Sequence, residues 1–177
     1  FTTVERLEGE APGKEKAEKP LLLDIYIDSS GSISNPRQNF SPLCLAGAIL
    51  ALSALRAGSR VRAVLWSGPG QVKTTNGFTR DQKDIFSVLT GYYGGGTAFP
   101  LLNMKEFYFN PSEKHRLLPG ERVHILVISD EGVDTMLSEA EGMPEGKTVI
   151  SSILDKAGGG GSLVLNLYQK GWVKSPA

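Results

Sequence analysis

Three short oxygen-bearing side chains follow an apolar stretch at alternate positions. Asp28, Ser30 and Ser32 come at the end of the run Leu-Leu-Leu-Asp-Ile-Tyr-Ile, residues 21–27. A run so strongly apolar is typical of a central strand that is covered on both faces. In open sheets of this kind, functional crevices form beyond the carboxyl ends of the central strands. We therefore expect the three side chains to line a small oxygen-rich site at that edge of a sheet.

Two further oxygen-bearing residues lie where later loops can reach the same edge. Thr97 follows the glycine run 94–96, and Asp130 follows a second strongly apolar run, 123–129. Two carboxylates that meet without a cation repel each other, and one of them tends to take up a proton. A hard divalent cation relieves this repulsion, and magnesium prefers oxygen ligands. The five residues are therefore predicted to bind Mg²⁺, with Mn²⁺ and Ca²⁺ as alternatives.

The elements that must position these residues alternate along the chain. Strands are predicted at 21–27, 60–67, 71–75, 123–129 and 163–168, and helices at 43–57, 81–89, 99–109, 133–141 and 147–157. The segment 71–75 follows a Gly-Pro-Gly turn and is expected to pair back as an antiparallel edge strand. This order predicts a three-layer α/β fold, in which helices cover both faces of an open, Rossmann-like, mainly parallel sheet.

Two local patterns predict how elements pack. Residues 43–57 are almost all apolar, so this helix is expected to be buried on most of its sides. Ser41 and Pro42 are suited to its N-cap and first position. The glycine run 158–161 is expected to be a flexible joint before the last strand.

Composition narrows the class of protein. The chain has 177 residues, of which 40% are hydrophobic, and Lys plus Arg equals Asp plus Glu at 19 each. A single domain with a core is therefore expected, and the zero net charge does not indicate a nucleic-acid-binding protein. The single cysteine, Cys44, excludes an internal disulfide framework and a cysteine-based zinc cluster, and it is expected to be buried.

The amino-terminal segment is polar and irregular. Residues 1–20 are interpreted as a linker or arm, and residues 21–177 as the metal-binding domain. The first residue is Phe1 rather than Met, so the chain is expected to be a piece of a longer protein. It contains no signal peptide and no apolar run of the roughly 18 residues that a membrane span needs, so a cytoplasmic location is expected.

The predicted metal ligands resemble the metal-ion-dependent adhesion site of von Willebrand factor A (vWA) domains. The matching positions, in order along the chain, are Asp28, Ser30, Ser32, Thr97 and Asp130. The resemblance covers about residues 21–168. It implies that the two serines bind the metal directly, and that the threonine and the aspartates bind it directly or through water. It also implies that the remaining coordination position accepts an Asp or Glu side chain of a protein partner.

The glycine run followed by Thr97 is similar to that of intracellular bacterial vWA proteins. Several of those work beside MoxR-type AAA+ ATPases or in chelatase-like assemblies, which makes such an ATPase or its substrate an expected partner. The chain departs from the family in one respect. The family sheet usually has a sixth strand and a terminal helix, whereas only nine residues follow Tyr168.

Residues beside the predicted site are candidates for contacts with that partner. They are Ser34, Tyr92, Tyr93 and Glu131. Aromatic side chains on a loop that lines a site are typical anchors of interfaces, which favours the two tyrosines.

Two other functions are weighed against a non-catalytic interaction module. Asp28 at a strand end also resembles the nucleophile of aspartyl phosphatases, so a metal-dependent phosphohydrolase is one alternative. Those enzymes normally have a second Asp two residues later, where this chain has Ser30. A scaffold domain with a vestigial metal site is the other alternative.

Overall fold

A computed structural model describes residues 19–137 and 146–166 of the chain. Its sheet has five strands in the order β3-β2-β1-β4-β5. Strands β1, β2, β4 and β5 run parallel, and β3 pairs antiparallel with β2 at one edge. The strand bounds are β1 Leu22–Asp28, β2 Val61–Trp66, β3 Val72–Thr74, β4 Val123–Ser129 and β5 Gly158–Leu165. The predicted mainly parallel sheet with an antiparallel edge strand is confirmed.

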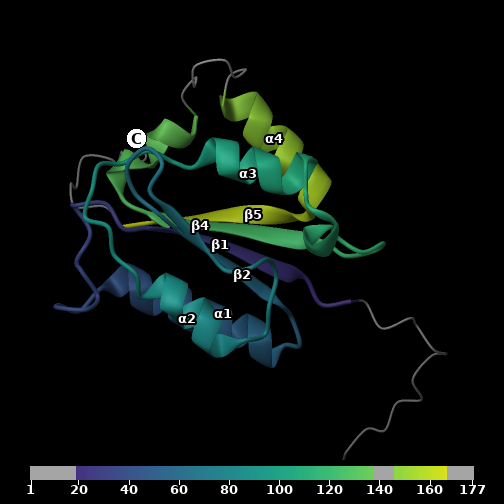
Figure 1. Ribbon diagram of the computed structural model, residues 1–177, viewed down its shortest axis with the longest axis horizontal. Coiled ribbons are helices and arrows are strands. Elements are labelled where there is room, and N and C mark those ends of the chain that lie inside the picture. Colours follow the sequence, from purple (N-terminus) through teal and green to yellow (C-terminus); the bar gives the residue numbers. More distant parts are fainter. Residues whose placement is uncertain (1–18, 138–145, 167–177) are drawn as a thin grey trace, which may run out of the picture.

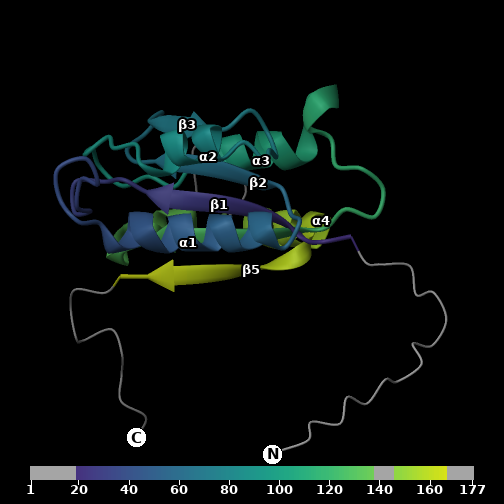
Figure 2. The same cartoon turned by 90° about the horizontal axis from the view of Figure 1, so that it is seen from below.

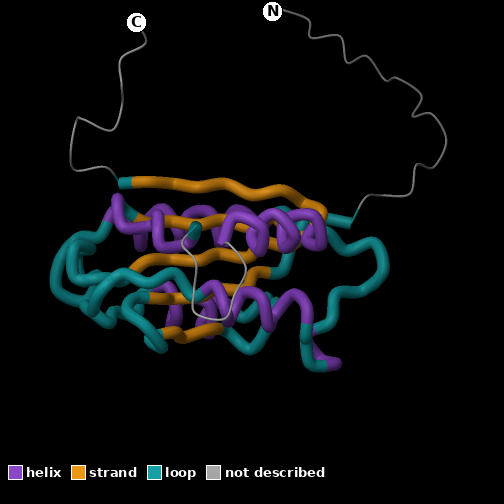
Figure 3. Tube along the Cα trace, turned by 90° about the horizontal axis from the view of Figure 1, so that it is seen from above, coloured by secondary structure: helices purple, strands orange, loops and turns teal. Residues whose placement is uncertain are grey.

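Helices cover both faces of this sheet, as predicted. Helices α1 and α2 lie on one face, and α3 and α4 lie on the other (Figure 1). The tube view shows the same three layers, with helices on either side of the strands (Figure 3). The bounds are α1 Pro42–Arg56, α2 Gln82–Leu89, α3 Leu101–Phe109 and α4 Gly146–Ala157, with short 3₁₀ helices η1 Glu113–His115 and η2 Glu131–Met136.

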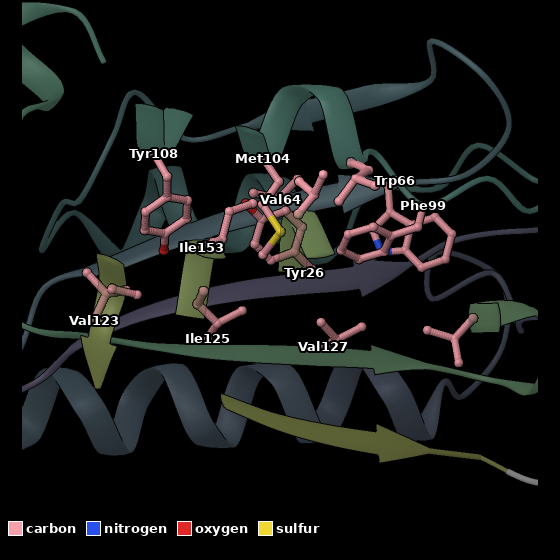
Figure 4. Packing of buried hydrophobic residues seen from close by; sticks show 14 of the residues in the cluster. Tyr26, Val64, Trp66, Phe99, Met104, Tyr108, Val123, Ile125, Val127 and Ile153 are labelled. Carbon is pink, nitrogen blue, oxygen red and sulfur yellow. The ribbon is translucent and has the colours of Figure 1, made fainter. Parts of the chain in front are cut away.

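A separate apolar core lies on each face of the sheet. Between the sheet and helices α3 and α4, the ring of Trp66 packs edge-on against Phe99 at 5.4 Å between centroids (Figure 4). On the α1 and α2 face, β1 contributes Ile25 and Ile27, and Cys44 is buried there, as predicted. Because both faces are covered, the central strands consist almost entirely of buried residues.

The helix starts follow from capping residues in the sequence. The hydroxyl of Ser41 accepts a hydrogen bond from the Cys44 N–H at the start of α1, where Pro42 holds the first position. The carboxylate of Asp81 accepts from two backbone N–H groups in the first turn of α2. These caps confirm the predicted starts to within a residue.

The glycine run 158–161 is not a joint, contrary to the prediction, because it forms the first half of β5. A Cβ atom at Gly159 would collide with the backbone carbonyl of Val123 on β4. Glycine is therefore required for the two strands to approach each other here. The predicted strand end at Tyr168 lies outside the described residues, as does the end of the helix predicted at 133–141, whose described part is the 3₁₀ helix η2.

Helix α1 is less buried than its composition predicts. Leu45 and Ile49 are 46% and 54% exposed in the described part of the chain. The helix packs on the sheet through small residues, including Gly47 and Ala51, and its opposite side faces solvent. The prediction of burial on most sides was therefore wrong for the described residues, because one helix contacts the sheet along a single stripe.

Candidate metal centre

The end of β1 directs alternate side chains in opposite directions. The hydroxyl of Ser29 points into the sheet and donates to the carbonyl of Trp66 on β2 at 2.9 Å. Asp28, on the other side, accepts the N–H of Ser30 at 2.7 Å. This local turn explains why the predicted ligands occupy every second position of the motif.

Four of the five predicted ligands form one hydrogen-bonded cluster. The hydroxyls of Ser30 and Ser32 lie 3.1 Å apart, and Ser32 donates to Asp130 at 2.5 Å. Asp130 caps η2 and also accepts the N–H of Gly132 at 3.1 Å. Residues 98 positions apart in the sequence are thus in direct contact, because β1 and β4 are adjacent parallel strands.

The glycine loop lies against the motif. The N–H of Gly31 donates to the carbonyl of Gly95 at 2.8 Å, and the N–H of Gly94 donates to the carbonyl of Ser29 at 2.9 Å. A Cβ at Gly31 would lie 3.3 Å from the Gly94 carbonyl oxygen. Glycine therefore suits the close contact between these two loops. The backbones of the glycine run and of the motif therefore lie in direct contact.

Thr97 lies beside the cluster without a hydrogen bond to it. A Cβ atom built on Gly132 would be 2.8 Å from Cγ2 of Thr97 and 3.2 Å from its hydroxyl oxygen. Gly132 is the residue whose N–H binds Asp130. The structure thus brings Thr97 next to the Asp130 turn.

Both carboxylates of the cluster are nearly inaccessible. Asp28 is 2% exposed and Asp130 is 4% exposed. Burial raises the pKa of the Asp28 carboxyl above its ordinary value of 3.8, and the negative charge of Asp130 adds to the rise. Hydrogen bonds from Ser129 and Ser30 oppose this rise. Among the described residues, no Lys, Arg or His forms an ion pair with either carboxylate.

This set of oxygen donors suits a hard cation that needs few protein ligands. No three His, Cys, Asp or Glu side chains gather as a metal cluster within residues 19–137 and 146–166. The donors are instead two carboxylates and neighbouring hydroxyls, all of them oxygens. Magnesium, which keeps several waters and uses few carboxylates, suits such a set.

Ser129 is a member of the site that the sequence analysis missed. Its hydroxyl donates to the second carboxylate oxygen of Asp28 at 2.6 Å, and its side chain is fully buried. A signal was available, because Ser129 is the polar residue directly before Asp130 at the end of an apolar strand. In the register of the sheet, Ile27 pairs with Ile128, which places Ser129 opposite Asp28.

The residues predicted to contact a partner are only partly gathered around the cluster. Ser34 and Tyr92 line a crevice of about 10 Å³ together with Asp28. Tyr93, in the same loop, is 40% exposed. The backbone of Glu131 opens η2, and its side chain lies outside what the structure describes.

An exposed aromatic that the sequence analysis missed lies between the motif and α1. Phe40 is 72% exposed, the largest exposed fraction of any described large apolar side chain. Its only signal in the sequence is its position in the polar loop before Ser41.

A cavity formed by described residues lies away from the cluster. It measures about 510 Å³ and is lined by residues including Phe107, His115 and Glu121, near the start of β4. The carboxyl ends of the strands (left in Figure 1) are at the other end of the sheet. The crevice that the described residues form beside Asp28 is small, about 10 Å³.

Comparison with known proteins finds similarity of structure only. No protein-family model and no curated protein matches the chain. A conserved hypothetical protein, BatB, from Bacteroides thetaiotaomicron is 16% identical, with 82% of this chain and 91% of that chain covered and a TM-score of 0.43. An aerotolerance-related membrane protein from Bacteroides fragilis is 16% identical, with 83% and 66% covered and a TM-score of 0.46.

The SpRpn10 VWA domain aligns over 86% of this chain and 90% of its own length, at 14% identity and a TM-score of 0.50. In the described residues, no helix is both long and apolar enough to cross a membrane. The strand order, the antiparallel edge strand and the helices on both faces agree with this last comparison. The chain therefore has the fold of a von Willebrand factor A domain.

Proposed function

We propose that this protein is a non-catalytic interaction module that binds Mg²⁺ and uses it to capture an acidic side chain of a protein partner. The observation that carries the proposal is the contact between Asp28, the two motif serines and Asp130. Two buried carboxylates lie in one hydrogen-bonded cluster with hydroxyls, and no described cationic side chain pairs with them. Such an arrangement favours a bound cation.

The residues that would hold the ion are those of the cluster together with Thr97. Asp28, Asp130 and the hydroxyls of Ser30 and Ser32 supply oxygen donors, and Ser129 holds the Asp28 carboxylate in place. A bound Mg²⁺ would supply a positive charge that favours a carboxylate ligand. Mn²⁺ and Ca²⁺ remain alternatives on the same donor chemistry.

A protein partner is favoured over a small substrate by the shape of the site. The crevice beside Asp28 is about 10 Å³, whereas small-molecule sites usually measure roughly 300–1,000 Å³. Exposed aromatic side chains in the two neighbouring loops, Tyr93 and Phe40, are suited to contact a protein surface. A side chain protruding from a macromolecule can reach such a site, while a free substrate would find little enclosure.

The partner is proposed from the resemblance of the glycine loop and motif to intracellular bacterial vWA proteins. On that basis, the module would act in the cytoplasm of a bacterium, within an assembly that contains a MoxR-type AAA+ ATPase or that ATPase's substrate. The acidic residue would come from one of these proteins.

Metal binding is the first test. Chemical denaturation with and without Mg²⁺ should show a gain in the free energy of unfolding of the wild type, about 2.7 kcal/mol at a hundredfold excess over the dissociation constant. Asp28→Ala should lose the gain. Asp155→Ala, which removes an exposed carboxylate on α4, should keep it. A wild type that gains nothing from Mg²⁺, Mn²⁺ or Ca²⁺ would leave the scaffold alternative standing.

Partner capture is the second test. A MoxR-type ATPase from the same source should bind the wild type in Mg²⁺, and binding should fall on chelation and in Asp28→Ala but not in Asp155→Ala. Phosphatase turnover that disappears in Asp28→Ala would contradict the proposal and support the hydrolase.

A further inference from the structure

A cavity of about 510 Å³ lies at the end of the sheet opposite the candidate metal centre. It is bordered by the end of α3, the loop that joins α3 to β4, and the last turn of α4. In Figure 2 this loop lies beyond one end of the sheet, and the arrowhead of β1, which ends at Asp28, points to the other end. Small-molecule sites usually measure roughly 300–1,000 Å³, so this volume suits a small molecule.

Three consecutive aromatic residues at the end of α3, 107–109, line the cavity. Contacts behind the first two hold their rings in place. The ring of Phe107 packs edge-on against Phe78 and Tyr108, at 5.8 and 5.4 Å between centroids. The guanidinium of the buried Arg62 lies 3.6 Å from the centroid of the Phe107 ring. Because the core fixes this aromatic wall, a flat apolar ring can pack against it without rearrangement of the chain.

The charged side chains that line the cavity favour an anion. Arg116 and Lys156 both line it, and neither forms an ion pair with a described residue. The ammonium of Lys156 lies 4.8 Å from the ring centroid of Phe109, so one cation and one aromatic ring are side by side. One acid, Glu121, also lines the cavity, but it is paired with Arg60 at 2.6 Å. Within the described part of the chain, the lining therefore presents two cations without a counter-ion.

We propose that this cavity binds a small aromatic acid, in which a flat apolar ring carries a carboxylate or phosphate group. The ring packs against Phe107 and Phe109, and the acidic group binds the guanidinium of Arg116 and the ammonium of Lys156. The planar fork of an arginine matches two oxygens of a carboxylate or phosphate, and a lysine adds a point charge. A neutral ring would leave both cations without a partner, and an anion without a ring would leave the aromatic wall uncovered.

Titration calorimetry of the full chain with four probes tests the class of ligand. Naphthoate and naphthyl phosphate carry both features, naphthalenemethanol keeps only the ring, and inorganic phosphate keeps only the charge. At least one naphthyl acid should bind roughly tenfold more tightly than the alcohol and inorganic phosphate, and the tighter acid identifies the acidic group. Equal affinity for the alcohol or for inorganic phosphate would overturn the proposal, as would the absence of binding of both acids at millimolar concentration.

Substitutions of exposed side chains place the ligand in the cavity. Arg116→Gln and Lys156→Gln should each weaken binding of the tighter acid roughly tenfold, because each removes a charge-assisted hydrogen bond. Phe109→Leu should weaken it several-fold. The matched control is Arg56→Gln, which removes an exposed arginine at the end of α1, on the other face of the sheet.

The control variant should bind the acid as the wild type does. Unchanged binding in both Arg116→Gln and Lys156→Gln would overturn the proposal, as would an equal loss in Arg56→Gln. The titration is repeated in chelator and in Mg²⁺, where the affinity should be the same. Binding that disappears in chelator would place the acid at the candidate metal centre and overturn the proposal, so this test is independent of the proposed function.

Discussion

Two buried aspartates on β1, four residues apart, have opposite electrostatic surroundings. Asp24 lies near the start of the strand and Asp28 at its end, and both are almost inaccessible. Arg62 on β2 donates to both carboxylate oxygens of Asp24, at 3.0 and 2.8 Å, and the hydroxyl of Tyr108 donates at 2.8 Å. Asp28 instead accepts from a serine hydroxyl and a backbone N–H, and faces the carboxylate of Asp130.

The two aspartates differ in whether the described part of the chain supplies a counter-ion: Asp24 has one, and Asp28 has none. Burial raises the pKa of Asp24 as well, but the charge of Arg62 and the hydrogen bonds from Tyr108, Arg62 and Tyr26 counteract the rise. The guanidinium of Arg62 also stacks 3.6 Å from the ring centroid of Phe107, so the pair is closed on all sides by the chain itself. At Asp28, the only described groups that counteract the rise are neutral donors. One strand thus carries a completed ion pair at one end and, at the other, the buried carboxylate that we propose binds a cation.

The largest expected effect comes from breaking the completed pair. Arg62→Met should lower the free energy of unfolding by about 3–5 kcal/mol, because it leaves the Asp24 carboxylate buried without a counter-ion. Urea denaturation measures the loss. The double variant Asp24→Asn/Arg62→Met should recover most of it, and a loss in the double variant as large as in the single one would show that packing of Arg62 on Phe107, not charge, is what matters.

A smaller effect is expected at Ser129, the neutral hydrogen-bond donor to Asp28. Ser129→Ala removes the 2.6 Å hydrogen bond to Asp28 and should weaken Mg²⁺ binding by about 1.5–3 kcal/mol, the usual contribution of a hydrogen bond to a charged group. Titration calorimetry measures the affinity. Ser29→Ala, which removes a hydrogen bond from the neighbouring motif position to Trp66, should leave the affinity nearly unchanged. Equal losses in both variants would contradict a specific role for Ser129.

Glycine at 132 should matter for the placement of Thr97 and Asp130. Gly132→Ala would force a Cβ to 2.8 Å from Cγ2 of Thr97, and overpacking of this kind costs about 1–3 kcal/mol. We expect a matching loss of Mg²⁺ affinity. Gly96→Ala is the control, because nothing lies within 4 Å of its added Cβ. If both variants bind Mg²⁺ as the wild type does, the position of Thr97 is not important for the site.

The smallest expected effect is on how the free energy of unfolding changes with pH. This change should have opposite signs in the metal-free and the metal-bound protein. Because the folded-state pKa of Asp28 is raised above 3.8, the folded protein binds more protons than the unfolded one between these two values. In chelator, the free energy of unfolding of the wild type should therefore fall relative to Asp28→Asn as the pH rises through this window. Asp24, with a pKa raised in the same direction, is present in both proteins and cancels.

Added Mg²⁺ should reverse that trend in the wild type, because the ion binds the ionised carboxylates and is displaced as they take up protons. Denaturation series at several pH values, with chelator and with Mg²⁺, measure both slopes. Parallel slopes in wild type and Asp28→Asn under both conditions would remove Asp28 from the candidate metal site.

The predictable part of the fold rested on patterns within single elements. The apolar runs before Asp28 and Asp130 predicted central strands, and the cap at Ser41 marked the start of a helix. The glycine run 158–161 was misread because glycine is permissive both in loops and where two backbones approach. The second property becomes visible only when Val123 lies beside Gly159.

By itself, the sequence determined the types and the order of the side chains in the candidate site, because alternation at a strand end and a loop after glycines are local features. It also implied that Asp28 and Asp130 would share one edge of a parallel sheet. Only the tertiary structure decided the rest. The register of β1 against β4 places Ser129 on Asp28, and the fold gives Asp24 its arginine while Asp28 has no described cationic partner. The sequence shows two similar acids on one strand, and their different surroundings arise from contacts between residues far apart in the chain.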